Sequence, residues 1–380
     1  MNILISAGEA SGDLYASALA RELAVRFPGA RFFGCAGPRL RDAGVEPVVR
    51  AESLNVVGLV EVVRHIPRIH GEFRKLVRAA ETRRPDLAIL TDSPDFHLRL
   101  APKLKALGVP VVYLIAPQAW AWRKGRIPAM RLAIDHLLCI FPFEEEFFRG
   151  HGVQTTYIGH PLTRLARPER TRVEFLARHG ISPDRPFVLL LPGSRPGEIA
   201  RHLPAATGAA ERIRAATGAT CALATPRSSQ GLTFLTEPLA RAHIQHIEGE
   251  TWDALAAADL ALAASGTVTI EAAILGAPLV TFYKVSPWSW WMGRYLVKVP
   301  FYSMVNLVAG RAVVPELMQE ACTPEALASE GLRLLADPAA RTEMQAGMHE
   351  VTRRLASDED PMKRAAVIVE SVLNKGSVHV

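Results

Sequence analysis

The stretch NILISAGEASGDLY, residues 2–15, decides how the chain begins to fold. A short apolar run, Ile3–Ile5, leads into small residues and glycine, which is typical of a buried strand that turns into a helix. Turns of this kind often cradle an anion at the helix N-terminus, yet this one carries two acids, Glu9 and Asp13. The G-x-G-x-x-G signature of dinucleotide binding is also absent. The stretch predicts an α/β unit and leaves open whether the protein is a dehydrogenase, a plain nucleotide binder or something else.

Short β-rich runs alternate with amphipathic helical stretches along most of the chain. The runs are uninterrupted and apolar, which predicts parallel sheets covered by helices on both faces. A Pro- and Arg-rich stretch, GHPLTRLARPERTR (159–172), separates two such series and predicts a hinge or linker between two doubly wound domains that face each other across a cleft. Helices are predicted at 12–27 and 96–107, and strands at 3–6, 31–35, 87–91, 111–115, 137–141, 156–158, 187–191, 220–224, 244–247, 260–263 and 279–283.

The two Rossmann-like domains are expected over residues 1–165 and 166–345, followed by a helical tail over 346–380. The 380 residues are 49% hydrophobic and 22% charged, a globular composition. Four widely spaced cysteines predict buried thiols in a reducing compartment instead of a disulfide frame or a zinc site. With neither a signal peptide nor an apolar run long enough to span a bilayer, we expect a cytoplasmic protein.

The formal net charge is +6, which favours an anionic partner without identifying one. Basic residues interleaved with base-stacking aromatics in a recognised module are lacking, so we expect no nucleic-acid binding. The histidines are scattered, and no metal-ligand cluster is apparent.

Two strand ends in the second series predict phosphate cradles. In LLLPGSRPGEI (189–199), Gly193 allows close approach to a ligand, Ser194 follows it, and Arg195 offers a planar cationic fork. The alternative is a tight turn with a surface arginine. In AASGTVTIEAAILGAP (263–278), small and hydroxyl residues again open a helix, and an acid four residues further on can accept hydrogen bonds from ribose hydroxyls. The residues of this second cradle are Ser265, Gly266, Thr267 and Glu271. Together the cradles predict a nucleoside diphosphate site.

Two strand ends in the first series carry candidate polar groups. In ILTDSPDFHLRL (89–100), Asp95 is the expected helix N-cap and Asp92 a candidate general base, with two turn-forming aspartates as the alternative. In APQAWAWRKGR (116–126), the tryptophans and basic residues are candidates for contact with an anionic ligand. The alternative is that the tryptophans pack in the core and the basic residues form a solvated helix start.

The motifs SAGEASGD, TDSPDF, AWAWR, LLPGSRPGEI, ASGTVTIEAA, SMVNLVAGR and VPELMQEAC together closely resemble those of the lipid-A-disaccharide synthase family, in order and from the first strand to about residue 325. The resemblance implies a GT-B type, metal-independent, inverting glycosyltransferase with no cofactor. Its donor would be UDP-2,3-diacylglucosamine and its acceptor 2,3-diacylglucosamine 1-phosphate, on the route to the lipid A of Gram-negative lipopolysaccharide. The products would be UDP and a β(1→6)-linked disaccharide 1-phosphate.

The resemblance also implies residue roles. Asp92 would be the general base, with Glu9 as its rival or helper, while Asp13 would complement the dipole of its helix. Arg195 and the helix starts after Gly193 and Gly266 would stabilise the leaving diphosphate. Asn306 would bind the UDP donor, and the residues that match family segments beside it are Arg311, Glu316 and Gln319.

Acylated substrates imply access to the inner face of the inner membrane, and residues 56–84 are the candidate contact. Their apolar residues recur at helical spacing beside basic ones, although Pro67 is expected to divide the stretch into two helices. The alternative is an amphipathic helix packed on its own sheet. The residues expected to face the acceptor or the membrane are Leu59, Val62, Val63, Arg64, Ile66, Arg68 and Ile69. The aromatic stretch 286–302 is a second candidate patch or an oligomer contact.

Three expectations remain open. Another UDP-sugar enzyme of this architecture, such as a UDP-N-acetylglucosamine 2-epimerase or an undecaprenyl-linked glucosaminyltransferase, would share the two cradles but is not expected to carry SAGEASGD and TDSPDF together. A UDP-sugar-binding membrane scaffold without activity is the non-enzymatic alternative. The family includes dimers that exchange C-terminal segments, so the helical tail would cross back to the first domain or to a partner subunit.

Overall fold

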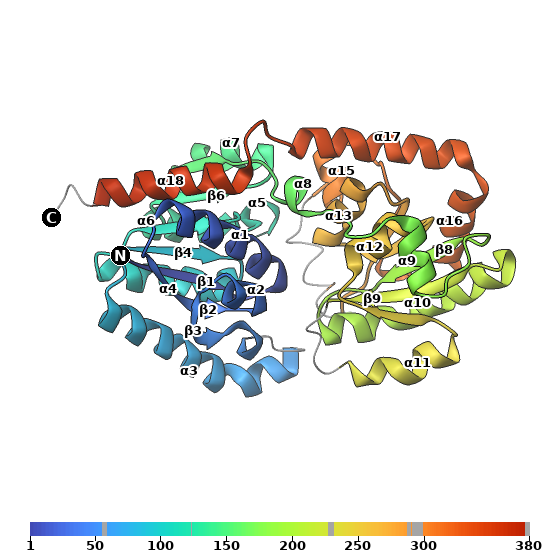
Figure 1. The fold of residues 1–380 in the computed structure, drawn as a ribbon, viewed down its shortest axis with the longest axis horizontal. Helices are drawn as coiled ribbons and strands as arrows, with labels where there is room; N and C mark the ends of the chain where they lie inside the picture. Colours follow the sequence, from blue (N-terminus) through green and yellow to red (C-terminus); the bar gives the residue numbers. More distant parts are fainter. Residues whose placement is uncertain (55–58, 123, 227–231, 287–289, 291–298, 377–380) are drawn as a thin grey trace. The chain divides into compact units, whose positions relative to one another are not determined.

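The computed structural model describes residues 1–54, 59–122, 124–226, 232–286, 290 and 299–376 (Figure 1). The chain forms two compact units. The first combines Met1–Pro161 with Leu355–Val380, and the second spans Leu162–Arg354. Each unit is built on one parallel sheet with helices around it, as the alternation of apolar strands and helices predicts.

The first unit holds a seven-stranded sheet in the order β3-β2-β1-β4-β5-β6-β7, with every pairing parallel. Its central strands are buried along their whole length because helices pack on both faces. The strands are β1 (Asn2–Ala7), β2 (Arg31–Ala36), β3 (Glu46–Arg50), β4 (Leu87–Thr91), β5 (Val111–Leu114), β6 (His136–Cys139) and β7 (Thr155–Tyr157). The helices are α1 (Ala10–Arg26), α2 (Pro38–Asp42), α3 (Leu59–Arg83), α4 (Pro94–Ala106), α5 (Ala119–Trp122), α6 (Ile127–Ala133), α7 (Pro142–Gly150) and α18 (Pro361–Gly376).

The second unit holds a six-stranded parallel sheet in the order β10-β9-β8-β11-β12-β13. The strands are β8 (Phe187–Leu191), β9 (Thr220–Thr225), β10 (Gln245–Glu248), β11 (Leu260–Ala264), β12 (Leu279–Tyr283) and β13 (Glu316–Met318). The helices are α8 (Leu162–Leu165), α9 (Arg172–Arg178), α10 (Pro196–Thr217), α11 (Thr236–Arg241), α12 (Thr251–Ala257), α13 (Thr267–Leu275), α15 (Met304–Ala309), α16 (Pro324–Ala336) and α17 (Pro338–Leu355).

The strands predicted from the sequence are confirmed to within one residue at each end, except that Leu137–Phe141 was expected to run two residues beyond Cys139, where β6 ends. Two edge strands, β3 and β13, were not predicted. The first contains a proline and is largely exposed, and the second is only three residues long and half-buried. Edge strands with these features lack the apolar run on which strand prediction depends.

Two further expectations meet different outcomes. All four cysteines are confirmed as buried free thiols. The expected break at Pro67 is wrong, since α3 continues through this residue from Leu59 to Arg83. Proline removes one N–H donor but keeps a helical φ, so a long helix with an apolar face to bury can accommodate it. Among the described helices, none is long and apolar enough to cross a membrane.

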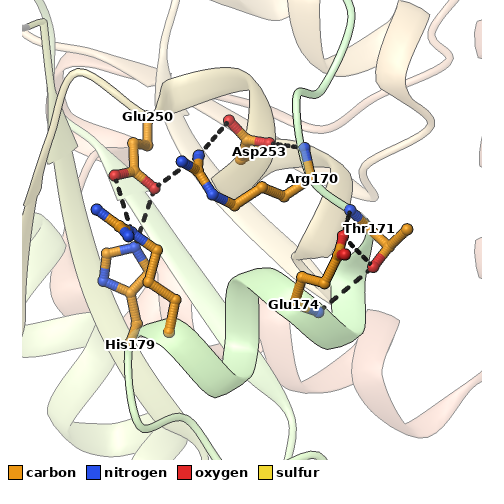
Figure 2. A network of polar contacts seen from close by, with 7 residues as sticks. Arg170, Thr171, Glu174, His179, Glu250 and Asp253 are labelled. Atoms are coloured by element: carbon orange, nitrogen blue, oxygen red, sulfur yellow. Dashed lines mark hydrogen bonds and ion pairs between the residues drawn. The ribbon is translucent and has the colours of Figure 1, made fainter.

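The stretch after the division at Pro161 is anchored to the second unit (Figure 2). The backbone N–H of Arg170 donates to Asp253 Oδ1 at 2.6 Å, and its guanidinium lies 3.5 Å from Glu250 Oε2. Thr171 then caps α9 through reciprocal hydrogen bonds with Glu174. The Pro- and Arg-rich stretch is therefore fixed from Arg170 onward.

The C-terminal helix belongs to the first unit, where α18 packs against α1 (Figure 1). Its apolar face is buried, and at the surface Arg26 pairs with Glu370 at 2.6 Å. The buried side chains are Met362, Ala365, Ala366 and Val369. Because surface ion pairs contribute little, the apolar burial is what holds the helix in place.

Candidate active site

Each sheet reverses its strand order at one point, and the candidate residues gather there. The reversal falls between β1 and β4 in the first unit and between β8 and β11 in the second. Ligands of open α/β sheets bind beyond the carboxyl ends of the strands at such switch points. Glu9 and Asp92 follow β1 and β4, while Gly193–Arg195 and Ser265–Thr267 follow β8 and β11. The topology therefore places the end of β1 beside the end of β4, and the end of β8 beside the end of β11.

The carboxylate of Asp92 is bound by the first turn of the chain. The N–H of Gly8 donates to Oδ1 at 2.9 Å, and the N–H of Glu9 donates to Oδ2 at 3.0 Å. A Cβ at Gly12 would lie 1.5 Å from Asp92 Oδ2, and one at Gly8 would lie 2.3 Å from Ser93 Oγ. The glycines of SAGEASGD are thus required by the close approach of the turn after β4.

The environment of Asp92 favours its protonated form. Burial, followed by the nearby charge of Glu9, raises the pKa of the Asp92 carboxyl to about 8, against the lowering effect of the Gly8 hydrogen bond. A carboxyl with a pKa near neutrality can both accept and release a proton at working pH. This is the property that a general base needs.

The backbone at Asp92 is also unusual. Asp92 and Ser93 have φ values of +55° and +39°, a left-handed conformation that non-glycine residues seldom adopt. Ser93 is the N-cap of α4, so the expectation that Asp95 caps this helix is wrong. Pro94 occupies the first helical position, which leaves Asp95 in the first turn, where it pairs with Arg126.

Asp13 acts on a helix other than its own. It lies in the first turn of α1 as expected, but its buried carboxylate accepts hydrogen bonds from the N–H groups of Arg39 (2.8 Å) and Leu40 (3.2 Å) at the start of α2. A Cβ at Gly37 would lie within 2.6 Å of the same carboxylate. Asp13 therefore holds the start of α2 against the first turn of α1. This structural role explains one of the two acids in the turn after β1.

In the loop after β8, a backbone amide already binds a carboxylate of the same chain, that of Glu198. Gly193 has a φ of +132°, and α10 begins at Pro196 with Arg195 as its N-cap. The N–H of Ser194 donates to Glu198 Oε2 at 3.0 Å, and a Cβ at Gly193 would lie 2.3 Å from the same oxygen. Glu198 was not identified from the sequence, although its place three residues after the N-cap is a usual position for a glutamate that reaches back.

Two further side chains support this loop. Burial, and then the charge and hydrogen bond of Glu198, raise the pKa of Tyr283 to about 12. His202 is fully buried and joins two strand ends, with Nδ1 at 2.7 Å from Pro192 O and Nε2 at 2.9 Å from Lys284 N. Since Nε2 accepts from an amide, Nδ1 carries the proton and the ring is neutral. Sequence reasoning missed both residues because their partners are distant in sequence.

The second cradle lies at the start of α13. Gly266 and Thr267 are exposed, and Glu271 is half-buried one turn further on. Ser265 is tied to its neighbours, because its N–H donates to Phe282 O at 2.9 Å and its hydroxyl donates to Tyr302 O at 2.8 Å. The topology brings these residues to the same switch point as Arg195.

Asn306 is buried, and its amide is engaged within the fold. Its Oδ1 accepts from the N–H groups of Val313 (2.7 Å) and Val314 (3.0 Å), and its Nδ2 donates to Val314 O and to Glu316 Oε1. Glu316 in turn accepts from the N–H of Ser303 at 2.9 Å. Asn306 thus fixes the backbone of the segment in which it was predicted to bind the donor.

The remaining candidates are dispersed. Trp120 donates to the buried Glu144 at 3.0 Å, a contact within the first unit. Arg311 pairs with Glu350 at 3.0 Å. Arg68 is exposed and Ile69 is half-buried on α3. The side chains of Leu59, Val62, Val63, Arg64 and Ile66 lie outside the described residues, as does most of the aromatic stretch 286–302. No group of three metal-ligating side chains occurs among the described residues.

Two doubly wound units with parallel sheets, each with polar residues at its switch point, correspond to the GT-B fold. Solved structures share this fold. The chain is similar to UDP-GlcNAc 2-epimerase from Neisseria meningitidis bound to UDP-GlcNAc (TM-score 0.65, 12% identity, covering 99% of this chain and 100% of that one). It is also similar to MurG from Acinetobacter baumannii (TM-score 0.55, 14% identity, 97% and 99% covered).

The family follows from the sequence comparisons. A family model described as lipid-A-disaccharide synthetase matches residues 3–371, and the chain belongs to this family. It is 58% identical to the lipid-A-disaccharide synthase of Solibacter usitatus over 378 residues, covering 100% of this chain and 99% of the relative. It is 44% identical to that of Myxococcus xanthus, with 99% and 98% covered.

Proposed function

We propose that the protein transfers 2,3-diacylglucosamine from UDP to the 6-hydroxyl of 2,3-diacylglucosamine 1-phosphate. The products are UDP and the β(1→6)-linked disaccharide 1-phosphate of lipid A biosynthesis. The observation that carries this proposal is the family match over residues 3–371. It is supported by the position of Asp92 and of the loops after β8 and β11 at the switch points of the two sheets. The same match disfavours an epimerase, an undecaprenyl-linked glucosaminyltransferase or an inactive scaffold.

The first unit supplies the base. The acceptor oxygen attacks the anomeric carbon from the face opposite the diphosphate, and its proton passes to the Asp92 carboxylate as the new C–O bond forms. The raised pKa of Asp92 supports this role, and the two N–H donors of Gly8 and Glu9 orient its oxygens. Glu9 then acts as a helper that raises the pKa of Asp92 through its charge.

The second unit stabilises the leaving group. As the bond from the anomeric carbon to the diphosphate oxygen breaks, negative charge collects on UDP. Arg195 and the N-terminal amides of α10 and α13 favour that charge, since each such donor contributes about 2–4 kcal/mol of barrier lowering in acyl transfer. Ser265, Thr267 and Glu271 complete the donor site in this proposal, with Asn306 fixing the segment beside it.

We also propose that this charge stabilisation suffices without a metal ion or cofactor. The assay that tests both the activity and this point measures disaccharide formation in detergent micelles with EDTA present. Product from the wild type, and almost none from Asp92→Asn with UDP binding retained, is the expected result. Full activity of Asp92→Asn would move the base to Glu9, and loss of wild-type activity in EDTA would overturn metal independence.

Substrate acyl chains support a peripheral contact with an anionic membrane through α3. In its described part, Leu76 and Ala80 are buried in the core, so the alternative of packing on the sheet holds for these residues. Arg68, Arg74 and Lys75 face solvent, which suits an anionic surface. Sedimentation with phosphatidylglycerol vesicles tests the contact. Binding that falls with salt and with Arg68→Glu is expected, and equal binding to neutral vesicles would contradict it.

A homodimer that exchanges the C-terminal helices is a separate proposal. In the single chain, α18 packs on α1 of its own first unit, and in an exchanged dimer the same apolar face would cover α1 of a partner. Light scattering at working concentration tests this. Twice the chain mass of 41.4 kDa is expected, and a monomer would contradict it.

A further inference from the structure

Two side chains bind the peptide that carries Asp92, and a third side chain holds one of them. The carbonyl oxygen of Asp92 accepts hydrogen bonds from Tyr113 Oη–H at 2.5 Å and from His97 Nδ1–H at 2.8 Å. The other ring nitrogen of His97 lies 2.7 Å from Ser6 Oγ. A carbonyl oxygen has two lone pairs, so both acceptor positions of this peptide are filled by side chains.

The sheet places two of these side chains in one row. Ser6 on β1 and Tyr113 on β5 are both in register with Leu90 on β4, two residues before Asp92. They therefore flank the same strand from opposite sides, on the face toward which Leu90 projects. His97, from the second turn of α4, bridges from this row to the Asp92 carbonyl.

The hydrogen bonds fix the tautomer of His97. A backbone carbonyl can only accept, so Nδ1 carries the proton and Nε2 accepts from the Ser6 hydroxyl. The ring is fully buried, and burial lowers the pKa of His97 to about 4. It is therefore neutral at working pH and does not compete with Asp92 for a proton.

The ring of His97 is also held by packing. It lies edge-on to Phe96 at 5.4 Å and to Tyr113 at 6.4 Å, and Phe96 packs edge-on against Phe73 of α3 at 5.5 Å. These contacts leave the imidazole little freedom to rotate. The carbonyl that it binds is equally restricted.

This restraint acts at a backbone conformation that is unfavourable by itself. The left-handed conformation of Asp92 and Ser93 persists only where surrounding contacts over-determine it. We propose that His97, assisted by Tyr113, is a positioning residue for the glycosyl transfer: it holds the Asp92 peptide so that the carboxylate faces Gly8, Glu9 and the acceptor. The inference rests on the proposed role of Asp92 as the base.

The test compares His97→Gln and Tyr113→Phe with a matched control, His136→Gln. His136 is the first residue of β6 and so lies at the amino ends of the strands, whereas Asp92 lies at their carboxyl ends. Its ring also forms a hydrogen bond with a hydroxyl, Thr156 Oγ1, at 2.9 Å. For the two positioning variants we expect kcat to fall about 10- to 100-fold, because a small misplacement of a reacting group is costly. KM for both substrates should stay within about twofold, since neither side chain is assigned a substrate contact.

The pH dependence separates positioning from a loss of folding. In the wild type, kcat should rise with pH and level off above about pH 8, and in the two positioning variants that inflection should move toward lower pH as the carboxylate gains access to water. The control should keep both kcat and the inflection. If His97→Gln does not fold, Tyr113→Phe tests the same carbonyl by removing one oxygen.

A double-mutant cycle shows whether His97 acts through Asp92. Adding His97→Gln to Asp92→Asn should cause no further loss of kcat, because the base is already absent. An equal loss in both backgrounds would overturn the inference, as would unchanged kcat and inflection in the folded single variants. Full activity of Asp92→Asn alone would instead remove the base assignment on which the inference rests.

Discussion

The two switch points of this chain use their polar groups in opposite ways. In the first unit, the Asp92 carboxylate accepts from two backbone amides, and its peptide oxygen accepts from two side chains. In the second, Ser194 and Arg195 are exposed, and the Glu198 carboxylate accepts a hydrogen bond from the N–H of Ser194. The first arrangement fixes a group that belongs to the protein, whereas the second is suited to receive an anion from outside.

Removing the fixed group should have the largest effect. Asp92→Asn keeps the shape of the side chain but cannot take a proton, so kcat should fall about 10²–10⁴-fold. The measurement is steady-state turnover, with UDP affinity from calorimetry as the control for an intact second unit. Weakened UDP binding would mean that the two sites are not separable in this way.

Arg195→Ala should produce the next largest fall in kcat, through the switch point of the second unit. Loss of one charge-stabilising donor costs about 10²–10³ in kcat. Arg195→Lys keeps the charge but not the planar fork, and it should recover part of the loss. Both variants are compared in turnover and in UDP affinity, and wild-type values for Arg195→Ala would exclude it from the donor site.

Gly12→Ala tests how tightly the first site is packed. Its Cβ would lie 1.5 Å from Asp92 Oδ2, so the carboxylate must move, and overpacking of this kind costs about 1–3 kcal/mol of stability. Gly266→Ala is the matched control for stability, because its backbone is extended and a Cβ there meets nothing within 4 Å. We expect a lower melting temperature and lower kcat for Gly12→Ala, and an unchanged melting temperature for Gly266→Ala. Equal melting temperatures would contradict the close approach.

Glu198→Gln should have a smaller effect, in the opposite direction. Removing a negative charge from the loop that receives the diphosphate should tighten UDP binding a few-fold, in keeping with the modest size of partly exposed charge effects. Calorimetric titration with UDP measures this. Weaker binding would mean that Glu198 serves only to order the loop.

The last prediction concerns how stability depends on pH. The pKa of Asp92 is raised in the folded state above its ordinary value of 3.8, so the folded state holds a proton that the unfolded state has released between about pH 4 and pH 8. This group's contribution to stability is therefore present at low pH and is lost as pH rises through that window. The melting temperature of Asp92→Asn should rise relative to the wild type from pH 5 to pH 8. A constant difference would contradict the raised pKa.

The sheets and the four strand ends could be predicted because they depend on local sequence. Uninterrupted apolar runs mark buried parallel strands, and small or polar residues mark where they stop. The partners of Asp13 and His97 could not be predicted in this way. The first serves a helix that begins 25 residues later, and the second is defined by Ser6, 91 residues earlier. The contact of Asp13 exists only once β1 and β2 are side by side, and the contacts of His97 only once β1, β4 and β5 are.

The errors at α4 and α3 both concern a proline, but they have different causes. A proline at the first helical position moved the cap from Asp95 to Ser93, and Pro67 was accommodated within a helix that buries Leu76 and Ala80. At α4 the observed cap agrees with the local preference of proline for the first helical position, whereas at α3 packing of the apolar face outweighs the local tendency of proline to break a helix.

The return of α18 to α1 has a consequence for biosynthesis. The first unit lacks its final helix until the roughly 190 residues of the second unit have been translated. At about 5–20 residues per second, the ribosome needs about 10–40 s for that stretch. During this time the surface of α1 against which α18 packs stays uncovered on the nascent chain. Chaperone demand during translation should therefore fall on the N-terminal unit, although it is made first.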